Sequence, residues 1–326
     1  MEYIGEIESI VATSLPSADQ GDFNELATAI QFYSSTITLV IGLIGNTLSV
    51  LVMCLPHNRD NVMCFYLRNL SIFDILLLVA AYLQPFWFTA NRTLGIAYCI
   101  IFYYFAHIFY CCSVYTVVII AVDRVIAVRY PLHASIWCTM KRAKISTMLL
   151  VVFCLGFYTA SLWVFPKFDP SQDGIRLTCI LPDYLEIYVI MKEIIGTPLP
   201  IFVVCVLNIT IAVSVGRHRK KMKQMTATTT EVTSQREDSK NNSMTLMLML
   251  VATCLIILLF PFFCDVLIWS FILPDLATAR SDLRYLSFVI IFIPAQLNHA
   301  VNFFLYCFGS RYFRKDLRML LSCRFK

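Results

Sequence analysis

The chain has 326 residues, of which 59% are hydrophobic and only 14% are charged. A soluble domain carries about 25% charged and about 45–50% apolar residues, so this chain has too few charges to cover a surface that faces water. The composition therefore indicates an integral membrane protein, and it excludes a disordered chain and a small disulfide-rich secreted module. The formal net charge of +5 raises the question of nucleic-acid binding, which the placement of the basic residues answers.

Seven long apolar stretches follow one another along the chain, at residues 31–55, 64–89, 96–128, 145–166, 187–215, 244–273 and 283–308. Each reaches the ~20 residues that a helix needs to cross ~30 Å of hydrocarbon. The alternating polarity of membrane β-strands is absent from them. Helices satisfy their backbone polar groups internally, so we expect an all-α membrane protein in which residues 31–308 form a seven-transmembrane helix bundle.

The Lys and Arg residues indicate the orientation of the chain, because cytoplasmic segments carry an excess of them. With the N-terminus outside, 20 of the 26 basic residues fall on the cytoplasmic side or at its helix ends, and 6 fall on the outer side. The sequence therefore predicts a multi-pass protein of the plasma membrane with an extracellular N-terminus. The same distribution explains the positive charge by contact with the lipid bilayer, without nucleic acid as a partner.

Polar segments flank and divide the bundle. Residues 1–30 are polar and acidic, lack the pattern of a cleaved signal peptide, and are expected to form an extracellular tail. Residues 216–243 are expected to form a cytoplasmic loop that is mobile from residue 220 to residue 242, where Thr, Ser and charged residues dominate. In residues 309–326, basic residues alternate with apolar ones, which predicts a short amphipathic eighth helix on the inner membrane face and a C-terminal tail.

Thirteen cysteines occur, and most of them fall in the spans or on the cytosolic side, where we expect small, reduced, hydrophobic side chains. Cys99 and Cys179 fall on the oxidising outer side and are expected to form a disulfide, with two free thiols as the alternative. No Cys or His cluster has the spacing of a metal site. Cys323 is a candidate for palmitoylation, and Asn91 begins an outer Asn-Arg-Thr glycosylation sequon.

Polar side chains inside the spans are costly in hydrocarbon and therefore indicate function. Asp74, Ser113, Asn298 and Asn302 lie at comparable depths in the second, third and seventh spans. Their carboxylate, hydroxyl and amide oxygens suit a small hard cation such as Na⁺, which would act as an allosteric ion. On residue types alone, a hydrogen-bonded packing cluster around a protonated Asp74 is an equal alternative. No other cofactor is expected.

Five short motifs stand in order on the spans: Gly45-Asn46, Leu70-Ser71-Ile72-Phe73-Asp74, Asp123-Arg124-Val125 followed by Pro131-Leu132, Asn302-Phe303-Phe304-Leu305-Tyr306, and the basic segment from Arg311. They resemble the GN, LSxxD, DRY…PL, NPxxY and eighth-helix motifs of the rhodopsin-like (class A) G-protein-coupled receptors. Val replaces the Tyr of DRY, and Phe replaces the Pro of NPxxY. The resemblance covers nearly the whole chain from residue 31.

The resemblance implies roles for the matching residues. Asp123 and Arg124 would pair at rest, and Arg124 would meet a heterotrimeric G protein in the active state. Leu132 would insert into the G-protein surface, and Tyr306 would swing inward on activation. Arrestin is implied as a further partner. The match of the Asp74 group to the family's sodium site favours Na⁺ over a packing cluster.

Other segments, at residues 165–168, 200–208 and 298–307, resemble invertebrate neuropeptide receptors of the FMRFamide kind. The implied ligand is a neuropeptide, and acidic residues near the outer mouth favour an amidated basic peptide. Ala106 stands where amine receptors carry Asp, and the seventh span has no Lys for a retinal Schiff base. The candidate ligand-binding residues are Gln84, Trp87, Tyr103, His107, Tyr110, Glu193, Asp265, Trp269 and Gln296.

Two other functions stay open from the sequence. A chemosensory receptor for a small molecule would use the same fold, with a sealed apolar pocket in place of a wide acidic mouth. A channel or transporter would need a polar stripe through the whole membrane depth or repeated broken helices, whereas the polar residues here gather at one level. We expect no enzyme activity, since no nucleophile–base pair, phosphate loop or metal motif stands on an aqueous face.

Overall fold

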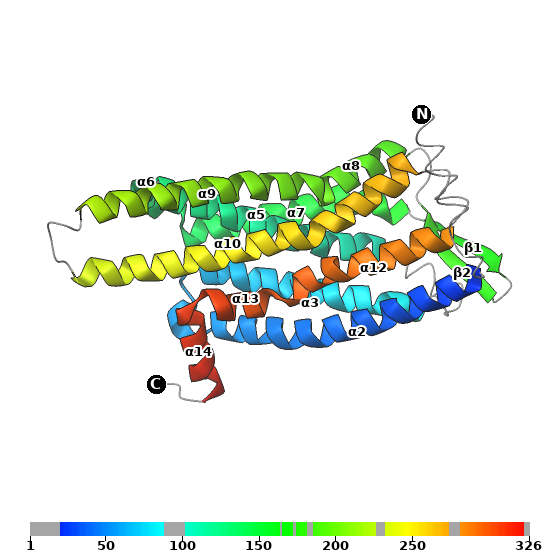
Figure 1. Ribbon diagram of the computed structural model, residues 1–326, viewed down its shortest axis with the longest axis horizontal. Coiled ribbons are helices and arrows are strands. Elements are labelled where there is room, and N and C mark those ends of the chain that lie inside the picture. The colour runs from blue at the N-terminus through cyan, green and yellow to red at the C-terminus, as the bar shows by residue number, and fades with distance from the viewer. Residues whose placement is uncertain are drawn as a thin grey trace.

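The computed structural model describes residues 20–87, 102–163, 165–171, 174–180, 185–225, 232–273 and 281–322. Long helices run side by side and form one elongated bundle (Figure 1). A two-stranded sheet lies at one end of this bundle, and helix α14 lies at the other (Figure 1). We refer to these two ends as the hairpin end and the α14 end.

The bundle is built from the helices α2 (Gln20–Met53), α3 (Val62–Trp87), α5 (His107–Arg129), α7 (Met140–Phe157), α8 (Glu186–Gly196), α9 (Pro198–Met225), α10 (Val232–Leu267), α12 (Ser281–Ala300) and α13 (Asn302–Gly309). The other helical elements are η1 (Pro56–Asn58), η2 (Phe102–Ala106), α6 (Pro131–Trp137), η3 (Tyr158–Trp163), η5 (Ile268–Ile272) and α14 (Arg311–Leu321). The two strands are β1 (Phe165–Ser171) and β2 (Gly174–Ile180).

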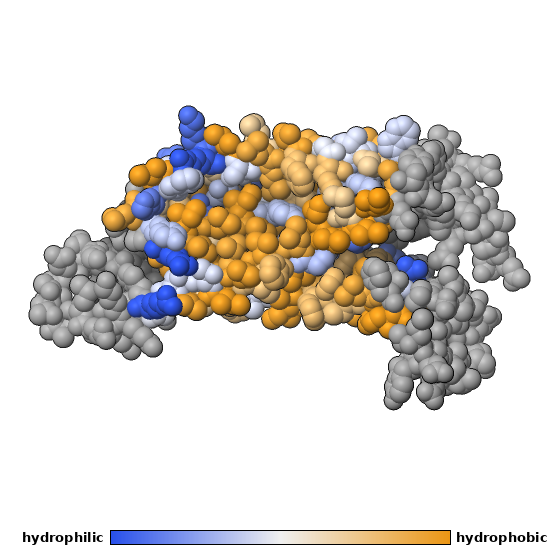
Figure 2. Space-filling model, turned by 90° about the horizontal axis from the view of Figure 1, so that it is seen from above, coloured by the Kyte–Doolittle hydropathy of each residue, from blue (hydrophilic) through white to orange (hydrophobic). Residues whose placement is uncertain are grey.

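The lengths and composition of the helices are those of a membrane bundle. Six helices of the described chain are long and apolar enough to cross a membrane, and the pair α12 and α13, bent by 51°, makes a seventh when it counts as one span. On α2, the outward-facing Ile37, Val40 and Ile44 are 51–60% exposed, as hydrocarbon permits. Figure 2 shows hydrophobic residues across the middle of one face and strongly hydrophilic residues mainly toward the α14 end. The expected fold class is therefore confirmed.

Two long helices extend beyond the expected spans. Helix α9 continues to Met225 and α10 begins at Val232, so most of residues 220–242 are helical, which the sequence pattern did not predict, and the mobility of this segment stays a prediction. Lys, Arg, Gln, Glu and Met in this segment are good helix formers, and extending an existing helix avoids the cost of starting one. At the other end of the chain, α2 begins at Gln20 rather than at residue 31.

The antiparallel pair of β1 and β2 is an addition to the expected all-helical fold. Phe165 lies opposite Ile180, and Ser171 lies opposite Gly174. Two prolines, Pro166 and Pro170, fall inside β1. Proline is confined to edge strands, and in a two-stranded sheet both strands are edges. The apolar pattern before residue 166 therefore ends in a strand rather than in a longer helix.

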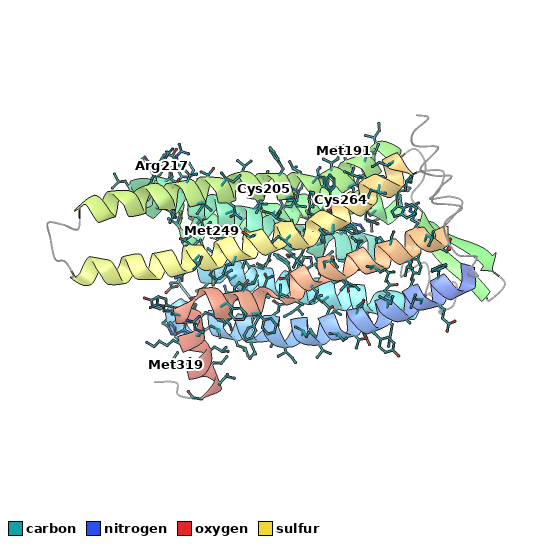
Figure 3. The ribbon with its side chains drawn as sticks, viewed as in Figure 1. Met191, Cys205, Arg217, Met249, Cys264 and Met319 are labelled. Carbon is teal, nitrogen blue, oxygen red and sulfur yellow. The ribbon has the colours of Figure 1, made fainter. Side chains whose placement is uncertain are left out.

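Buried apolar side chains hold the helices together. The main core joins α3, α5, α9, α10 and α13, and a smaller cluster between α5 and α7 contains the thiols of Cys111, Cys112 and Cys154. All ten cysteines whose side chains are described are free thiols. Figure 3 places two of them, Cys205 and Cys264, on α9 and α10. These cysteines behave as the small hydrophobic residues that the sequence predicts.

Candidate functional site

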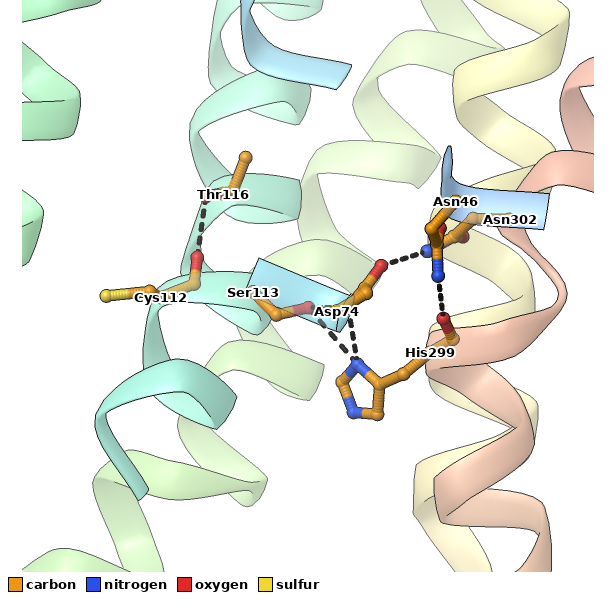
Figure 4. A network of polar contacts seen from close by, with 7 residues as sticks. All are labelled: Asn46, Asp74, Cys112, Ser113, Thr116, His299 and Asn302. Carbon is orange, nitrogen blue, oxygen red and sulfur yellow. Dashed lines mark hydrogen bonds and ion pairs between the residues drawn. The ribbon is translucent and has the colours of Figure 1, made fainter. Parts of the chain in front are cut away.

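A hydrogen-bonded cluster lies in the core where α3, α5, α12 and α13 meet (Figure 4). Asp74 is fully buried, and its Oδ1 accepts a hydrogen bond from Ser113 Oγ at 2.6 Å. Its Oδ2 accepts from Asn302 Nδ2 at 2.8 Å. Asn298, the fourth residue of the predicted sodium site, is buried, but its side chain is not among the described hydrogen-bond partners of Asp74. The structure thus brings together three of the four predicted residues.

His299 belongs to the same cluster, although sequence reasoning did not assign it a role. Its Nδ1 lies 2.7 Å from Asp74 Oδ1 and 3.2 Å from Ser113 Oγ. The imidazole therefore lies against a carboxylate oxygen that a sodium ion would use, so the residues fit a sodium ion only in part. The available signal was the spacing: His299 precedes Asn302 by three residues, which places both on one helical face.

The bend between α12 and α13 has a cause other than proline. Asn46 Nδ2, from α2, donates a hydrogen bond to the backbone carbonyl of His299 at 2.9 Å. A side chain that inserts into the backbone ladder is a known cause of kinks. In the turn that follows His299, the backbone forms an i→i+3 hydrogen bond, in which Phe304 N donates to Val301 O at 2.9 Å. Asn46 of the Gly-Asn motif thus stabilises the 51° bend, next to the position where Phe303 replaces the proline of the NPxxY motif.

A cavity of about 330 Å³ lies between the helices on the hairpin-end side of this cluster. Small-molecule sites span roughly 300–1,000 Å³, so this cavity is at the small end of that range. Four of the nine predicted ligand-binding residues line it: His107, Tyr110, Glu193 and Gln296. Most of the wall is apolar, with aromatic rings from Phe262, Phe288 and Phe292, and His299 also reaches it.

Lys192 brings a positive charge to the wall of this cavity. The residue is 7% exposed, and its Nζ lies 3.1 Å from Glu193 Oε1 and 3.4 Å from His107 Nε2. Lys192 was not among the predicted ligand-binding residues, although it stands next to Glu193 in the sequence. Because the ammonium and the carboxylate are paired, the cavity offers both signs of charge rather than an acidic surface alone.

Asp265 and Trp269 bind each other at the end of α10 and in η5. Trp269 Nε1 lies 3.1 Å from Asp265 Oδ1 and 2.6 Å from Ser287 Oγ. Neither Asp265 nor Trp269 is among the residues that line the cavity, so their contact with a ligand stays a prediction. Gln84 and Trp87 fall in α3 and Tyr103 falls in η2, but their side chains lie outside the described part of the structure.

The residues matched to G-protein contact lie toward the α14 end. Arg124 Nη2 is 3.5 Å from Asp123 Oδ2, and both residues are largely buried, so they form the pair that the motif implies for a resting state. Leu132, on α6, is 86% exposed, whereas Tyr306, on α13, is fully buried. Leu132 is therefore accessible to a partner in this conformation, and Tyr306 is not.

Helix α14 has the form expected of the eighth helix. Ser310 Oγ caps it by accepting a hydrogen bond from Phe313 N at 3.2 Å. Phe313 is 4% exposed and packs on the main core, while Arg314 Nη1 donates to the carbonyl of Cys307 at 2.6 Å. The apolar residues of α14 thus anchor it across the end of the bundle (Figure 1).

Several predicted sites lie outside the described residues. Asn91, Cys99 and Cys323 are among them. The backbone of Cys179 lies in β2 opposite Pro166, but its side chain is not described. The disulfide, the glycosylation site and the palmitoylation site therefore stay predictions.

Comparison with known proteins decides the family. Residues 45–306 match the family described as 7 transmembrane receptor (rhodopsin family). The chain belongs to this family. The match contains the Gly-Asn motif at its start, the Asp74 cluster and Tyr306 at its end. The protein is therefore a signalling receptor and not an enzyme.

The relatives carry names that refer to different ligands. The receptor is 25% identical over 202 residues to "Rhodopsin, GQ-coupled" of Mizuhopecten yessoensis, and the matched region covers 57% of this chain and 39% of that protein. It is 30% identical over 128 residues to "Olfactory receptor 4E2" of Mus musculus, and the matched region covers 38% of this chain and 40% of that protein. It is 29% identical over 126 residues to "FMRFamide peptide receptor frpr-18" of Caenorhabditis elegans, and the matched region covers 36% of this chain and 29% of that protein. The chain thus matches well under half the length of these relatives.

Proposed function

We propose that the protein is a plasma-membrane receptor that binds a neuropeptide at its hairpin end and activates a heterotrimeric G protein at its α14 end. The observation that carries this proposal is the position of the cavity next to the Asp74 cluster. His299 lines the cavity and also contacts Asp74, so a ligand in the cavity can act directly on the polar core. The basic residues gathered at the α14 end support an extracellular hairpin end and N-terminus.

The size of the cavity limits how a peptide would bind. A volume of about 330 Å³ holds one end or one large side chain of a peptide, and not a whole peptide. The remainder would lie across the hairpin end. Glu193 supports a basic group on the ligand, and the resemblance to an FMRFamide peptide receptor supports a peptide. A basic group of the ligand would have to share the Glu193 carboxylate with Lys192 or displace it.

At the α14 end, the same proposal assigns the coupling surface. Ligand binding must favour a conformation in which Arg124 leaves Asp123 and faces the G protein, because a ligand shifts only an equilibrium that it binds unequally. Leu132 would insert into the partner's surface, as its exposure permits. Arrestin would use the same surface.

A small-molecule chemosensory receptor is the second candidate function. The mostly apolar wall and the small volume of the cavity favour it, and one relative is named as an olfactory receptor. The two candidates share the cavity and differ in whether the ligand also needs the hairpin end.

A sodium ion would compete with His299 for the oxygens of Asp74 and Ser113. A sodium ion would use Asp74 Oδ1 and Ser113 Oγ, the two oxygens that His299 Nδ1 contacts. Binding of the ion therefore requires that the imidazole move away from Asp74.

The proposed function is tested by screening a neuropeptide library and a small-molecule library on cells that express the full chain, with G-protein activation as the readout. For an activating basic peptide, Glu193→Gln should lower the potency about tenfold, which corresponds to about 1.4 kcal/mol and is within the range for a lost hydrogen bond to a charged group. Met191→Leu, on the exposed side of α8 (Figure 3), should leave potency unchanged. Equal potency in wild type and Glu193→Gln would remove Glu193 from the site, and activation by no compound would overturn the proposed function.

A further inference from the structure

His299 has one polar atom for which the described receptor supplies no partner. The residue is 3% exposed and lines the cavity. Its Nδ1 contacts Asp74 and Ser113, whereas its Nε2 has no hydrogen-bond partner among the described residues. In Figure 4 the Nε2 atom points away from Asp74. Buried polar atoms are almost always hydrogen-bonded, and because this one faces a cavity, a molecule in the cavity can supply its partner.

Two other polar groups of the cavity wall are hydrogen-bonded within the receptor. The Tyr110 hydroxyl is 3.0 Å from Thr197 Oγ1. Gln296 Nε2 donates to Ser35 Oγ at 3.1 Å. Tyr110 packs its ring edge-to-face against the His299 ring, with the centroids 5.8 Å apart, which fixes the plane of the imidazole. Nε2 is thus a positioned polar atom at the inner end of a largely apolar cavity.

The contacts of Asp74 determine the chemistry of that atom. Each carboxylate oxygen of Asp74 accepts a hydrogen bond, Oδ1 from Ser113 and Oδ2 from Asn302. Nδ1 of His299 lies 2.7 Å from Oδ1, so Nδ1 is the ring nitrogen that donates to this acceptor. Nε2 faces the largely apolar cavity and has no acceptor among the described groups, so a second proton there would be an unpaired charged N–H. The uncharged ring avoids this cost, and its Nε2 holds a lone pair and accepts a hydrogen bond. The Asp74–His299 pair therefore presents a hydrogen-bond acceptor to the cavity.

We propose that Nε2 of His299 is the innermost ligand contact of this receptor, and that it selects a ligand whose deepest end is an N–H or O–H donor linked to an aromatic group. The inference rests on the proposed function and names the chemical class that its cavity takes. The aromatic part would pack against Phe262, Phe288 and Phe292, and the donor would reach Nε2. An ester or a tertiary amide would place lone pairs or methyl groups against the Nε2 lone pair and would be rejected.

This contact also gives the ligand a short route to the bend of α12 and α13. The backbone carbonyl of His299 accepts from Asn46, and its side chain contacts Asp74. A ligand that pulls on Nε2 therefore acts on one residue that participates in both the polar cluster and the bend.

The test uses the purified full-length receptor in lipid nanodiscs and three probes that share one aromatic group. The probes are 3-phenylpropanamide, its N,N-dimethyl amide and methyl 3-phenylpropanoate, and binding is measured by ligand-observed NMR and by the shift in unfolding temperature. We expect the primary amide to bind wild-type receptor at least tenfold more tightly than the other two. Phe292→Leu, a control on the apolar wall, should weaken all three probes alike.

Two variants of His299 distinguish the contributions of its two ring nitrogens to binding. His299→Asn keeps a donor near the position of Nδ1 and removes the atom at Nε2, whereas His299→Gln keeps an acceptor near Nε2. We expect the preference for the primary amide to vanish in the Asn variant and to persist in the Gln variant. The unfolding temperature without probe shows whether each variant folds, and Phe292→Leu supplies a second folded reference.

Equal binding of the three probes to wild type, or no binding of the primary amide, would overturn the inference and leave an internal water as the partner of Nε2. A preference that survives in the Asn variant would also overturn it. Because binding is measured without a G protein, this result is independent of the proposed function. A His299-dependent preference in a chain that activates no G protein would uphold the inference and reject the function.

Discussion

The two ends of the bundle treat their polar residues differently. Toward the α14 end, Asp123 and Arg124 pair with each other inside the chain. In the hairpin-end half, Lys192, Glu193 and His299 line a cavity, and Nε2 of His299 has no partner among the described groups. The difference lies in the surroundings: Arg124 Nε also has no described hydrogen-bond partner but is packed in the core, whereas Nε2 of His299 faces a cavity that a ligand can enter. The Asp74 cluster lies between the two.

Asp74→Ala should produce the largest loss of stability. It removes the carboxylate that Ser113, His299 and Asn302 contact and leaves all three buried, for which we expect a loss of about 3–5 kcal/mol. Thermal unfolding of the purified receptor measures the effect. Asp60→Ala changes an exposed carboxylate and should stay within about 0.5 kcal/mol of wild type. Equal stability of the two variants would mean that the cluster does not join the two halves.

Gly309→Ala should destabilise the α14 end. A Cβ at this position would lie 2.7 Å from the backbone Cα of Met247, so a packed helix must shift, at about 1–3 kcal/mol. Gly156→Ala is the matched control, since its Cβ would meet nothing within 4 Å and alanine favours the helix by roughly 0.5–1 kcal/mol. The unfolding temperatures should therefore move in opposite directions, and a shared direction would contradict this packing.

Leu132→Asp should weaken G-protein coupling without changing stability. The side chain is 86% exposed on α6, so it contributes little to folding. We expect about a tenfold loss in nucleotide-exchange efficiency, or about 1.4 kcal/mol. Ile136→Asp alters another exposed apolar residue of α6, 60% exposed, and reports non-specific damage. An equal loss in both variants would assign the effect to the helix rather than to Leu132.

His299→Ser should increase the response to sodium. In wild type, His299 Nδ1 competes for Asp74 Oδ1, whereas the serine variant frees that oxygen. At a sodium concentration tenfold above its dissociation constant, the stabilisation should reach about 1.4 kcal/mol. Unfolding in sodium chloride is compared with unfolding in choline chloride, and Asp74→Asn should respond to neither salt. A response no greater than that of wild type would exclude the competition.

Cys138 should react slowly with maleimide. Burial, followed by the nearby Asp123 carboxylate, raises the pKa of this thiol from 9.0 to about 11. Only the thiolate reacts, so at pH 7 very little of Cys138 is reactive, and its rate should rise about tenfold per pH unit up to about pH 11. Cys54 is exposed and serves as the reference thiol in peptide mass spectrometry. Faster labelling of Cys138 than of Cys54 at pH 7 would contradict the packing around Asp123.

The sequence predicts those features that depend on long runs of apolar residues or on fixed spacings between motif residues. The spans, the amphipathic α14 and the meeting of Asp74, Ser113 and Asn302 are of this kind. It was insufficient where a helix face or a strand pairing decides the outcome. Lys192 and Glu193 are neighbours in the chain, and only the packing of α8 shows that both reach the cavity. The spacing of His299 to Asn302 was a signal for a shared helical face, but the sequence does not show that the imidazole contacts Asp74.

The hydrogen bond from Asn46 to the carbonyl of His299 ties the bend of the seventh span to a neighbouring helix. A proline ring would fix such a bend sterically within its own segment, because it clashes with the preceding turn. Here an amide nitrogen of α2 satisfies a backbone carbonyl at the bend, so the loss of this contact would leave that buried carbonyl without this donor. The stability of the bent form therefore depends on α2 as well as on the span that bends.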